Sequence, residues 1–326
     1  MKKSVGILFV VSLMAAPCFS QFKTPVAQEV NQVKNKALLV ETQEYVTRTL
    51  MDLENNPDAQ QRYKNGVDSF NSYLKYAVDK FFKWSKKPAE YMPASKVAAL
   101  LRDGKAIKYV ILHYTVEKSY VNPLDIGPVY GGEYNDSART FSKSKGYGVF
   151  SLEMPGNDNK TEDIYTVAMP VAYPSEADMI YAIQMMHNVF TDVTKIKDYD
   201  IKDFHDNIIR NKRFLKKRTL LVAKSQVSGK TTLQELKEGY DWPIKIVDYK
   251  TIDEAVRNSD SAYAYIEVVP LKASAQQAGR LSTVLRDLVI DAKDGKVLGS
   301  AKPGRMDREK VADDITKREL SEMMER

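Results

Sequence analysis

The chain has 326 residues, 49 Lys plus Arg against 43 Asp plus Glu, and 43% hydrophobic residues, so its formal net charge is +6. This composition excludes a disordered, collagen-like or disulfide-stapled protein, because the apolar content is ordinary and there is one cysteine. At about 150 residues per domain, the length predicts two domains or two similar halves, each large enough to bury a core.

Residues 1–20 have the composition of a secretory signal peptide. Lys2 and Lys3 precede an apolar run over residues 5–16, and small residues lead to Ser20. This is the charged, apolar and small-residue order of exported proteins. The run is too short for the roughly 20 residues that span a bilayer. We therefore expect a bacterial protein that is periplasmic or secreted, with cleavage after Ser20.

Lipidation of Cys18 is the less favoured alternative for the same segment. A lipobox has a small residue directly before its cysteine, whereas this chain has Pro17 there. Cleavage after Ser20 would remove the one cysteine and, with it, disulfides, thiol catalysis and thiolate metal sites. No later segment approaches 18 uninterrupted apolar residues, so we expect a mature protein that is not transmembrane.

Residues 21–194 are predicted to form a first α/β domain. Short apolar runs indicate buried strands, and apolar residues at helical spacing indicate helices. An amphipathic helix rich in aromatic residues is inserted at about residues 58–86. In chain order, the expected elements are a strand (36–40), the inserted helix, a strand (91–92), a helix (95–103), a strand (109–116), two hairpin strands (149–154 and 164–169) and a helix (177–193).

The stretch 117–147 is longer than the roughly 12 to 15 residues that a loop of a compact domain usually has. It combines glycines with tyrosines and cations, which gives rigid amphipathic side chains on an adaptable backbone, as in protein-binding paratopes. It is either a binding loop or an insertion that folds over its own domain. The candidate partner-binding residues are Tyr120, Tyr130, Tyr134, Arg139 and Tyr147.

Residues 195–218 are predicted to be a basic helical connector, with the helix over residues 199–217. The connector has nine basic and four acidic residues. Its plain interpretation is a solvated helix end, since cations are favoured near a helix carboxyl terminus. The alternative is a polyanion contact, for which anionic lipid or lipopolysaccharide suits an exported protein better than nucleic acid. The candidate residues are Arg210, Lys212, Arg213, Lys216, Lys217 and Arg218.

Residues 219–326 are predicted to form a second α/β domain with the same order of elements. The run RTLLV at residues 218–222 echoes KALLV at residues 36–40, which we interpret as part of an internal repeat. The expected elements are a strand (218–222), a helix (231–238), a strand (246–247), a helix (250–258), a strand (263–270), two hairpin strands (281–291 and 296–300) and a C-terminal helix (307–324).

The predicted fold class is α/β, with two related three-layer-like units that contain mixed sheets, each ordered βαβα, then a β-hairpin, then a helix. Short βα alternation implies parallel neighbours, and a hairpin adds antiparallel strands. This order resembles the amino-terminal domain of TolB and related envelope α/β modules that take part in protein assembly. The resemblance is one of topology, is carried by no sequence motif and transfers no residues.

His113 and Glu267 are polar residues inside apolar strands, at matching places in the two halves. The carboxyl ends of parallel strands are where α/β sheets usually place ligand groups. The sequence has no spacing that would complete His113 as a catalytic or metal site. The segment 227–232 lacks the first glycine of a phosphate-binding loop, so we interpret it as a helix cap with Thr231 or Thr232 as the N-cap. We predict no catalytic residue, cofactor or metal.

The export signal, the paired halves and the lack of catalytic motifs favour a non-enzymatic interaction or assembly module of the bacterial cell envelope, with an envelope protein as partner. The second hypothesis is a periplasmic small-ligand-binding protein with a cleft between two lobes and with His113 or Glu267 at its rim. The third is a hydrolase of unidentified class, which requires a serine, a histidine or paired carboxylates to converge in a cleft.

Overall fold

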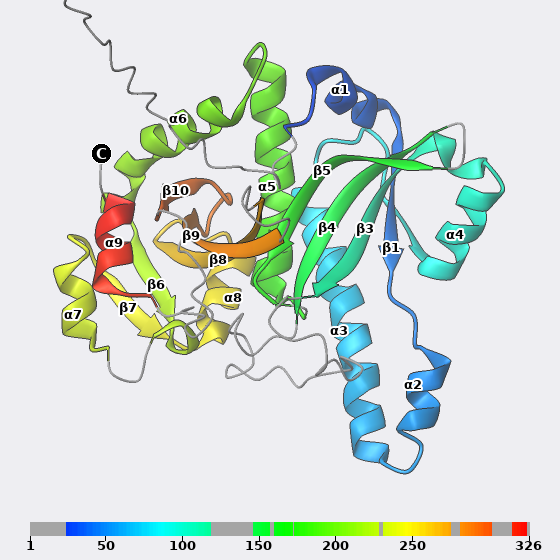
Figure 1. The fold of residues 1–326 in the computed structure, drawn as a ribbon, viewed down its shortest axis with the longest axis horizontal. Coiled ribbons are helices and arrows are strands. Elements are labelled where there is room, and N and C mark those ends of the chain that lie inside the picture. The colour runs from blue at the N-terminus through cyan, green and yellow to red at the C-terminus, as the bar shows by residue number, and fades with distance from the viewer. Residues whose placement is uncertain are drawn as a thin grey trace, which may run out of the picture.

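The computed structural model describes residues 24–118, 146–156, 160–171, 173–227, 231–274, 281–301 and 315–324. Within these residues the chain forms two mixed five-stranded sheets flanked by helices (Figure 1). The strand order is β2-β1-β3-β4-β5 in sheet A and β7-β6-β8-β9-β10 in sheet B. The structure therefore confirms the predicted α/β class with two sheet-and-helix units.

Sheet A comes from the first half of the chain. Strand β1 pairs in parallel with β2 and β3, whereas β3, β4 and β5 pair antiparallel. The strands are β1 (Ala37–Thr42), β2 (Glu90–Pro93), β3 (Tyr109–Lys118), β4 (Gly146–Pro155) and β5 (Thr161–Met169). The accompanying helices are α1 (Ala27–Asn35), α2 (Thr47–Asp52), α3 (Pro57–Phe81), α4 (Ala94–Arg102), the 3-10 helix η1 (Lys105–Lys108) and α5 (Glu176–Lys195).

Sheet B comes from the second half and has the same pattern of parallel and antiparallel pairs. Its strands are β6 (Thr219–Ala223), β7 (Ile244–Val247), β8 (Tyr263–Ser274), β9 (Leu281–Asp291) and β10 (Val297–Ser300). The remaining helices are α6 (Ile201–Asn211), α7 (Leu233–Glu238), α8 (Tyr249–Arg257), α9 (Lys317–Met324) and the 3-10 helices η3 (Lys212–Lys217) and η4 (Lys224–Gln226).

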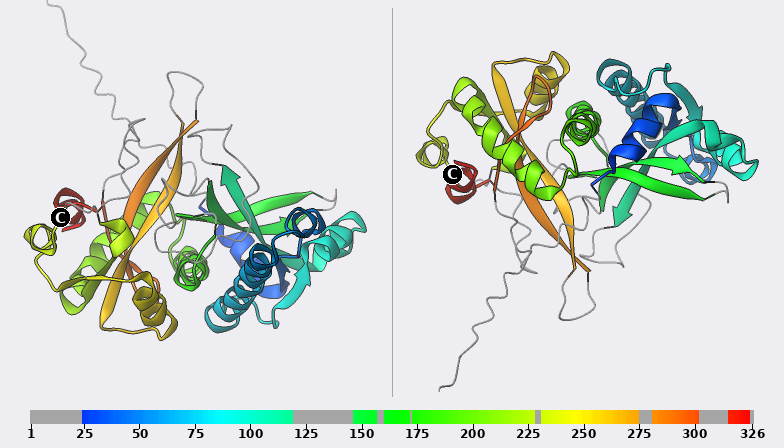
Figure 2. Two further views of the ribbon diagram at one scale, coloured as in Figure 1. Left: turned by 90° about the horizontal axis from the view of Figure 1, so that it is seen from below. Right: turned by 90° about the horizontal axis from the view of Figure 1, so that it is seen from above.

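Helix α5 lies between the two sheets and is buried on all its sides over most of its length (Figure 2). A helix whose surface is apolar all round needs a partner on more than one side. Its residues belong to a core cluster that also contains Phe150 of sheet A, Ile290 of sheet B and Ile252 of α8. The two units therefore share one hydrophobic core through α5.

Polar contacts fix the first turn of α5 against α8. Ser175 is the N-cap, and its hydroxyl accepts from the Asp178 backbone N–H. Two more hydrogen bonds of this turn come from the second unit. Tyr249 donates to Asp178 Oδ1 at 2.7 Å, and the Ala177 N–H donates to Asp253 Oδ1 at 2.8 Å. The capped helix end thus ties α5 to the unit that follows it in the chain.

Replacing Tyr249 by phenylalanine should lower the free energy of unfolding by about 1.5–3 kcal/mol, because a buried hydrogen bond to a carboxylate is lost. Tyr45→Phe is the matched control, since exposed Tyr45 donates to Asp68 Oδ1 at 2.6 Å. Water replaces that bond, so the control should cost well under about 1 kcal/mol. Urea unfolding of both variants measures the difference, and equal losses would contradict this role of Asp178 and Tyr249.

Several predicted bounds differ from the structure. The inserted helix, for example, ends at Phe81 and not near residue 86. Two further differences bear on the candidate residues. The connecting helix does not run from 199 to 217 as one α-helix, because the chain tightens into η3 after Asn211 and buries Leu215 in the core of the second unit. Tyr147 is not a loop residue, because β4 already begins at Gly146 and the Tyr147 side chain is 1% exposed. Its burial removes Tyr147 from the candidate partner-binding residues.

Candidate functional site

His113 and Glu41 meet across two parallel strands of sheet A. Val40 of β1 lies opposite Leu112 of β3, so the residues that follow them are neighbours. The Nδ1 atom of His113 lies 3.0 Å from Glu41 Oε2, and the side chains are 32% and 17% exposed. The imidazole is therefore held by a carboxylate in a fixed orientation.

The pair belongs to a row of polar residues that crosses sheet A. His113 lies opposite Ser151 of β4, and Ser151 lies opposite Thr166 of β5. The residues beside them on the strands, such as Leu112 and Phe150, enter the core next to α5, so the polar row lies on the opposite face of the sheet. We call this surface the His113 face and define it by Glu41, His113, Ser151, Glu153, Asp163 and Thr166.

The strands of sheet A lie in front of α3 and α5 in Figure 1, and the His113 face is on the side away from those helices. Helix α4 and η1 cover the neighbouring part of the same face, where Val97 and Ala106 pack on Leu39 and Ile111. Ser151 is nevertheless only 8% exposed, because its neighbours in the row surround it. The face therefore presents a small, ordered polar surface beside α4.

Negative charge dominates the electrostatics around His113. The hydrogen bond to Glu41 raises the pKa of His113, burial opposes the shift, and the charges of Glu41, Glu153 and Asp163 raise it further. Burial lowers the pKa of His187 and of His205 below the ordinary value. His113 is thus the histidine that the fold holds in its protonated form to the highest pH.

Replacing Glu41 by glutamine should lower the pKa of His113 toward or below its ordinary value, as followed by NMR titration of the histidine ring protons. Because the folded-state pKa is raised, the stabilisation is fully present below the unfolded-state pKa of about 6.5 and is lost as the pH rises through the folded-state pKa. The variant should therefore lose more stability at about pH 6 than at about pH 9.

Glu162→Gln is the control for this titration, since Glu162 is an exposed carboxylate of β5 that does not contribute to the shift. It should leave the titration of His113 unchanged. An unchanged His113 titration in the Glu41→Gln variant would show that the two side chains do not interact in solution.

Glu267 occupies the position of sheet B that matches His113, but its surroundings are different. It is 0% exposed and lies on the side of β8 that faces α5. Burial is the larger cause that raises the pKa values of Tyr181 and Tyr265, and the charge of Glu267 raises them further. Burial also lowers the pKa of nearby Arg286 to about 10. The fold does not bring Glu267 and His113 to one rim, because α5 and sheet A separate them.

The basic connector divides into buried and exposed cations. Arg218 is 13% exposed and pairs with Asp291 at 3.0 Å, so it is not available to a polyanion. The exposed residues of the cluster are Arg210, Arg213, Lys216 and Lys217, with Lys212 half-buried. A polyanion contact at these residues stays a prediction.

Some of the other predicted positions are described by the structure and some are not. Tyr120, Tyr130, Tyr134 and Arg139 lie outside the described residues, as do residues 228–230. Thr232 is the N-cap of α7, because its hydroxyl accepts from the Glu235 backbone N–H, and this confirms one of the two predicted caps.

Where the structure describes the chain, it contains no group of three or more His, Cys, Asp or Glu side chains that could hold a metal ion. Among the same residues, no helix has both the length and the apolarity to cross a bilayer. Comparisons with protein-family models, with curated proteins and with solved structures found no match. The His113 face and the surfaces around it are therefore the features from which a function can be inferred.

Sequence reasoning missed the partner of His113. Glu41 ends an apolar run, and a single carboxylate at such a place is an ordinary strand end. The pairing of β1 with β3 is what makes the two residues neighbours.

Proposed function

We propose that the protein is an exported, non-enzymatic interaction module of the bacterial cell envelope, and that a partner docks on the His113 face. The proposal rests on a comparison of this face with its equivalent on sheet B. Both sheets have the same strand order, and the faces correspond because α4 and α8 occupy the same place in their units.

The equivalent face of sheet B is covered by α5 and is largely apolar, whereas no described helix corresponds to α5 on the His113 face. Strand register relates the positions one by one. The matched pairs are Glu41 with Ala223, His113 with Glu267, Ser151 with Leu288, and Glu153 with Ile290. The face that no described helix equivalent to α5 covers thus has polar side chains where sheet B has mostly apolar ones, as is typical of an interaction surface.

Site-specific photocrosslinking in cells tests this proposal. The photoreactive residue p-benzoylphenylalanine is placed at Thr115, which is the next residue of β3 on the His113 face, and at exposed Lys250 of α8 as the matched control. A crosslinked product of defined mass from position 115 and none from position 250 is the expected result. The same products from both positions, or none from either, would contradict docking on this face.

Export is tested separately by the mass of the chain recovered from the periplasm. We expect the mature protein to begin at Gln21 and to have the mass of the unmodified chain, without an acyl group. A full-length chain that stays in the cytoplasm would contradict the predicted leader.

A hydrolase is the second candidate, because Glu41, His113 and Ser151 follow one another across the sheet in the order carboxylate, imidazole and hydroxyl. This is the order of residues in an acid, base and nucleophile relay. Among the described residues no hydrogen bond joins His113 to Ser151, so a substrate would have to bring the two together. Labelling by a fluorophosphonate that is lost in Ser151→Ala would support this candidate, and an unlabelled wild-type protein would exclude it.

A further inference from the structure

The end of α6 and the 3-10 helix η3 carry a dense group of cations. Five of the nine residues 209–217 are Lys or Arg, and none is Asp or Glu. The backbone stays helical through Asn211 and Lys212, so residues three or four positions apart lie on one side of the segment. Ile208 and Leu215 are 7% and 0% exposed and belong to the cores. The segment therefore packs on the protein through these two residues and turns most of its cations outward.

Four of the cations are exposed, and they lie beside an exposed isoleucine. We call this group the connector surface and define it by Ile209, Arg210, Arg213, Lys216 and Lys217. Among the residues that the structure describes, none of these four cations forms an ion pair. Arg218, the next residue along the chain, is paired with Asp291 and does not belong to the connector surface. The surface therefore has an uncompensated positive charge.

Ile209 distinguishes the connector surface from a helix end that carries cations alone. Its side chain is 62% exposed, whereas its neighbour Ile208 is the one that enters the core. Ile209 lies one turn before Arg213, so its side chain is placed among the cations. A soluble polyanion gains little from an apolar side chain. A lipid bilayer gains more, because the apolar side chain enters the acyl boundary while neighbouring cations contact the phosphate headgroups.

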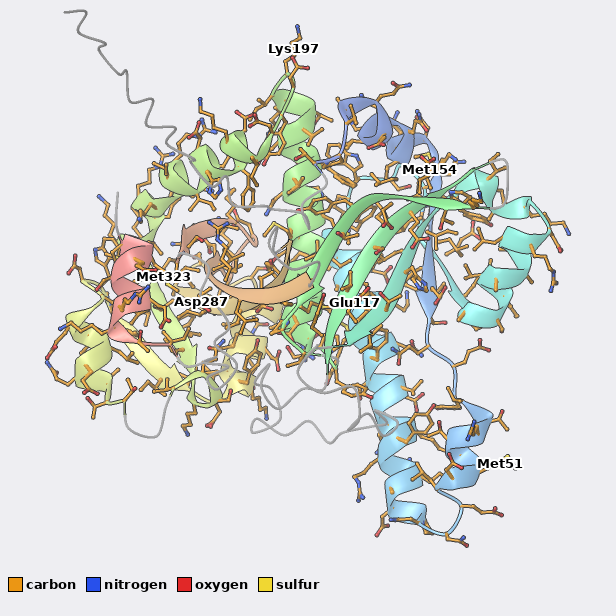
Figure 3. The ribbon with its side chains drawn as sticks, viewed as in Figure 1. Met51, Glu117, Met154, Lys197, Asp287 and Met323 are labelled. Atoms are coloured by element: carbon orange, nitrogen blue, oxygen red, sulfur yellow. The ribbon has the colours of Figure 1, made fainter. Side chains whose placement is uncertain are left out.

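The connector surface lies on the outside of the second unit. Helix α6 and η3 pack along β10, which is the edge strand of sheet B, on the side turned away from sheet A (Figure 2). Met51 of α2 is another exposed apolar residue, at 67% exposure. It lies far from Lys197, in the turn that leads into α6, so the two exposed apolar positions belong to separate surfaces (Figure 3).

From this combination of charge and apolar exposure we infer that the connector surface docks on a bilayer of anionic phospholipid. Ile209 enters the headgroup layer, and the four cations contact the lipid phosphates. The inference is independent of the proposed partner of the His113 face, because that face belongs to sheet A and the connector surface lies beside sheet B. Attachment by a few cations and one apolar side chain is reversible and sensitive to salt.

Cosedimentation of the purified protein with lipid vesicles tests the inference. One set of vesicles contains phosphatidylglycerol and phosphatidylcholine in equal parts, and the other contains phosphatidylcholine alone. We expect binding to the anionic vesicles and little binding to the neutral ones. Binding should be lost at about 0.5 M salt, where the Debye length is only a few ångströms.

Two variants each remove one part of the connector surface. The variant with Lys216→Gln and Lys217→Gln should bind anionic vesicles at least about tenfold more weakly, because each cation near an anionic surface contributes roughly fivefold to the affinity. Ile209→Ser should weaken binding to the same vesicles by about fivefold, because the inserted apolar side chain is lost. Ile209→Ser should leave binding to heparin, a soluble polyanion, unchanged.

Matched controls change similar residues elsewhere on the chain. Met51→Ser removes an apolar side chain of comparable exposure from α2. The variant with Lys237→Gln and Lys250→Gln removes two exposed lysines from α7 and α8. Both controls should bind anionic vesicles like the wild-type protein. Circular dichroism checks that all variants are folded.

Three results would overturn the inference. The first is a wild-type protein that does not bind the anionic vesicles, and the second is equal binding by the connector variants and their controls. The third is loss of heparin and vesicle binding in the lysine variant with no effect of Ile209→Ser, which would assign the cations to a soluble polyanion. A photocrosslink from position 115 would leave the proposed function standing in each case.

Discussion

Replacing Phe190 by alanine is expected to lower the free energy of unfolding of the whole chain by about 3–5 kcal/mol, the cost of removing a large aromatic side chain from a packed core. Phe190 of α5 is 0% exposed, and its ring lies 6.0 Å from that of Trp84 and 6.1 Å from that of Tyr165, centroid to centroid. The cavity would open beside sheet A. Because α5 also packs on sheet B, the second unit should lose stability with the first.

Urea unfolding measured by near-UV and far-UV circular dichroism checks the Phe190 prediction, with coincident transitions as the sign of a single cooperative unit. Lys195→Ala, an exposed residue at the end of the same helix, is the matched control and should change stability by less than about 0.5 kcal/mol. A large loss confined to one of two separate transitions would show that α5 belongs to the first unit alone.

Gly295→Ala is expected to cost about 2–5 kcal/mol, because two effects combine. Gly295 has a φ of +69°, which L side chains rarely adopt. A Cβ atom at this position would lie 2.5 Å from Cβ of Gln184, a residue of α5 that is 4% exposed. Because this turn joins β9 to β10, the substitution would push sheet B away from α5.

Gly104→Ala separates the two effects. Gly104 has a φ of +67° in the turn after α4, remote from α5. The backbone cost alone should be about 1–2 kcal/mol, so the excess loss in Gly295→Ala reports the contact with Gln184. Thermal unfolding of both variants gives the comparison. Equal losses would mean that the turn does not press on α5 in solution.

The order of strands and helices was predictable because it depends on local patterns. Alternating or continuous apolar runs mark β3 and β8, and helical spacing marks α4 and α8, so the elements appear in the structure close to their predicted bounds. The burial of the long helix after the first hairpin also has a local signal. Its sequence is apolar on every side, which indicates a helix with partners in more than one direction.

The candidate site was only half predictable. His113 stands out as a polar residue in an apolar strand, but its partner Glu41 is set by strand pairing, which no local pattern encodes. Glu267 matches His113 in the repeat and still has the opposite environment, because α5 covers one face and not the other. Likewise, Arg218 belongs to a run of basic residues in the sequence, but in the fold it pairs with Asp291, which is distant along the chain.

Native-state hydrogen exchange tests most directly whether α5 joins the two sheets into one cooperative body. We predict that the slowest amides of β3 and of β8 share one opening free energy and that Phe190→Ala lowers both by the same amount. Two different opening free energies, with only the amides of β3 affected by the substitution, would contradict it.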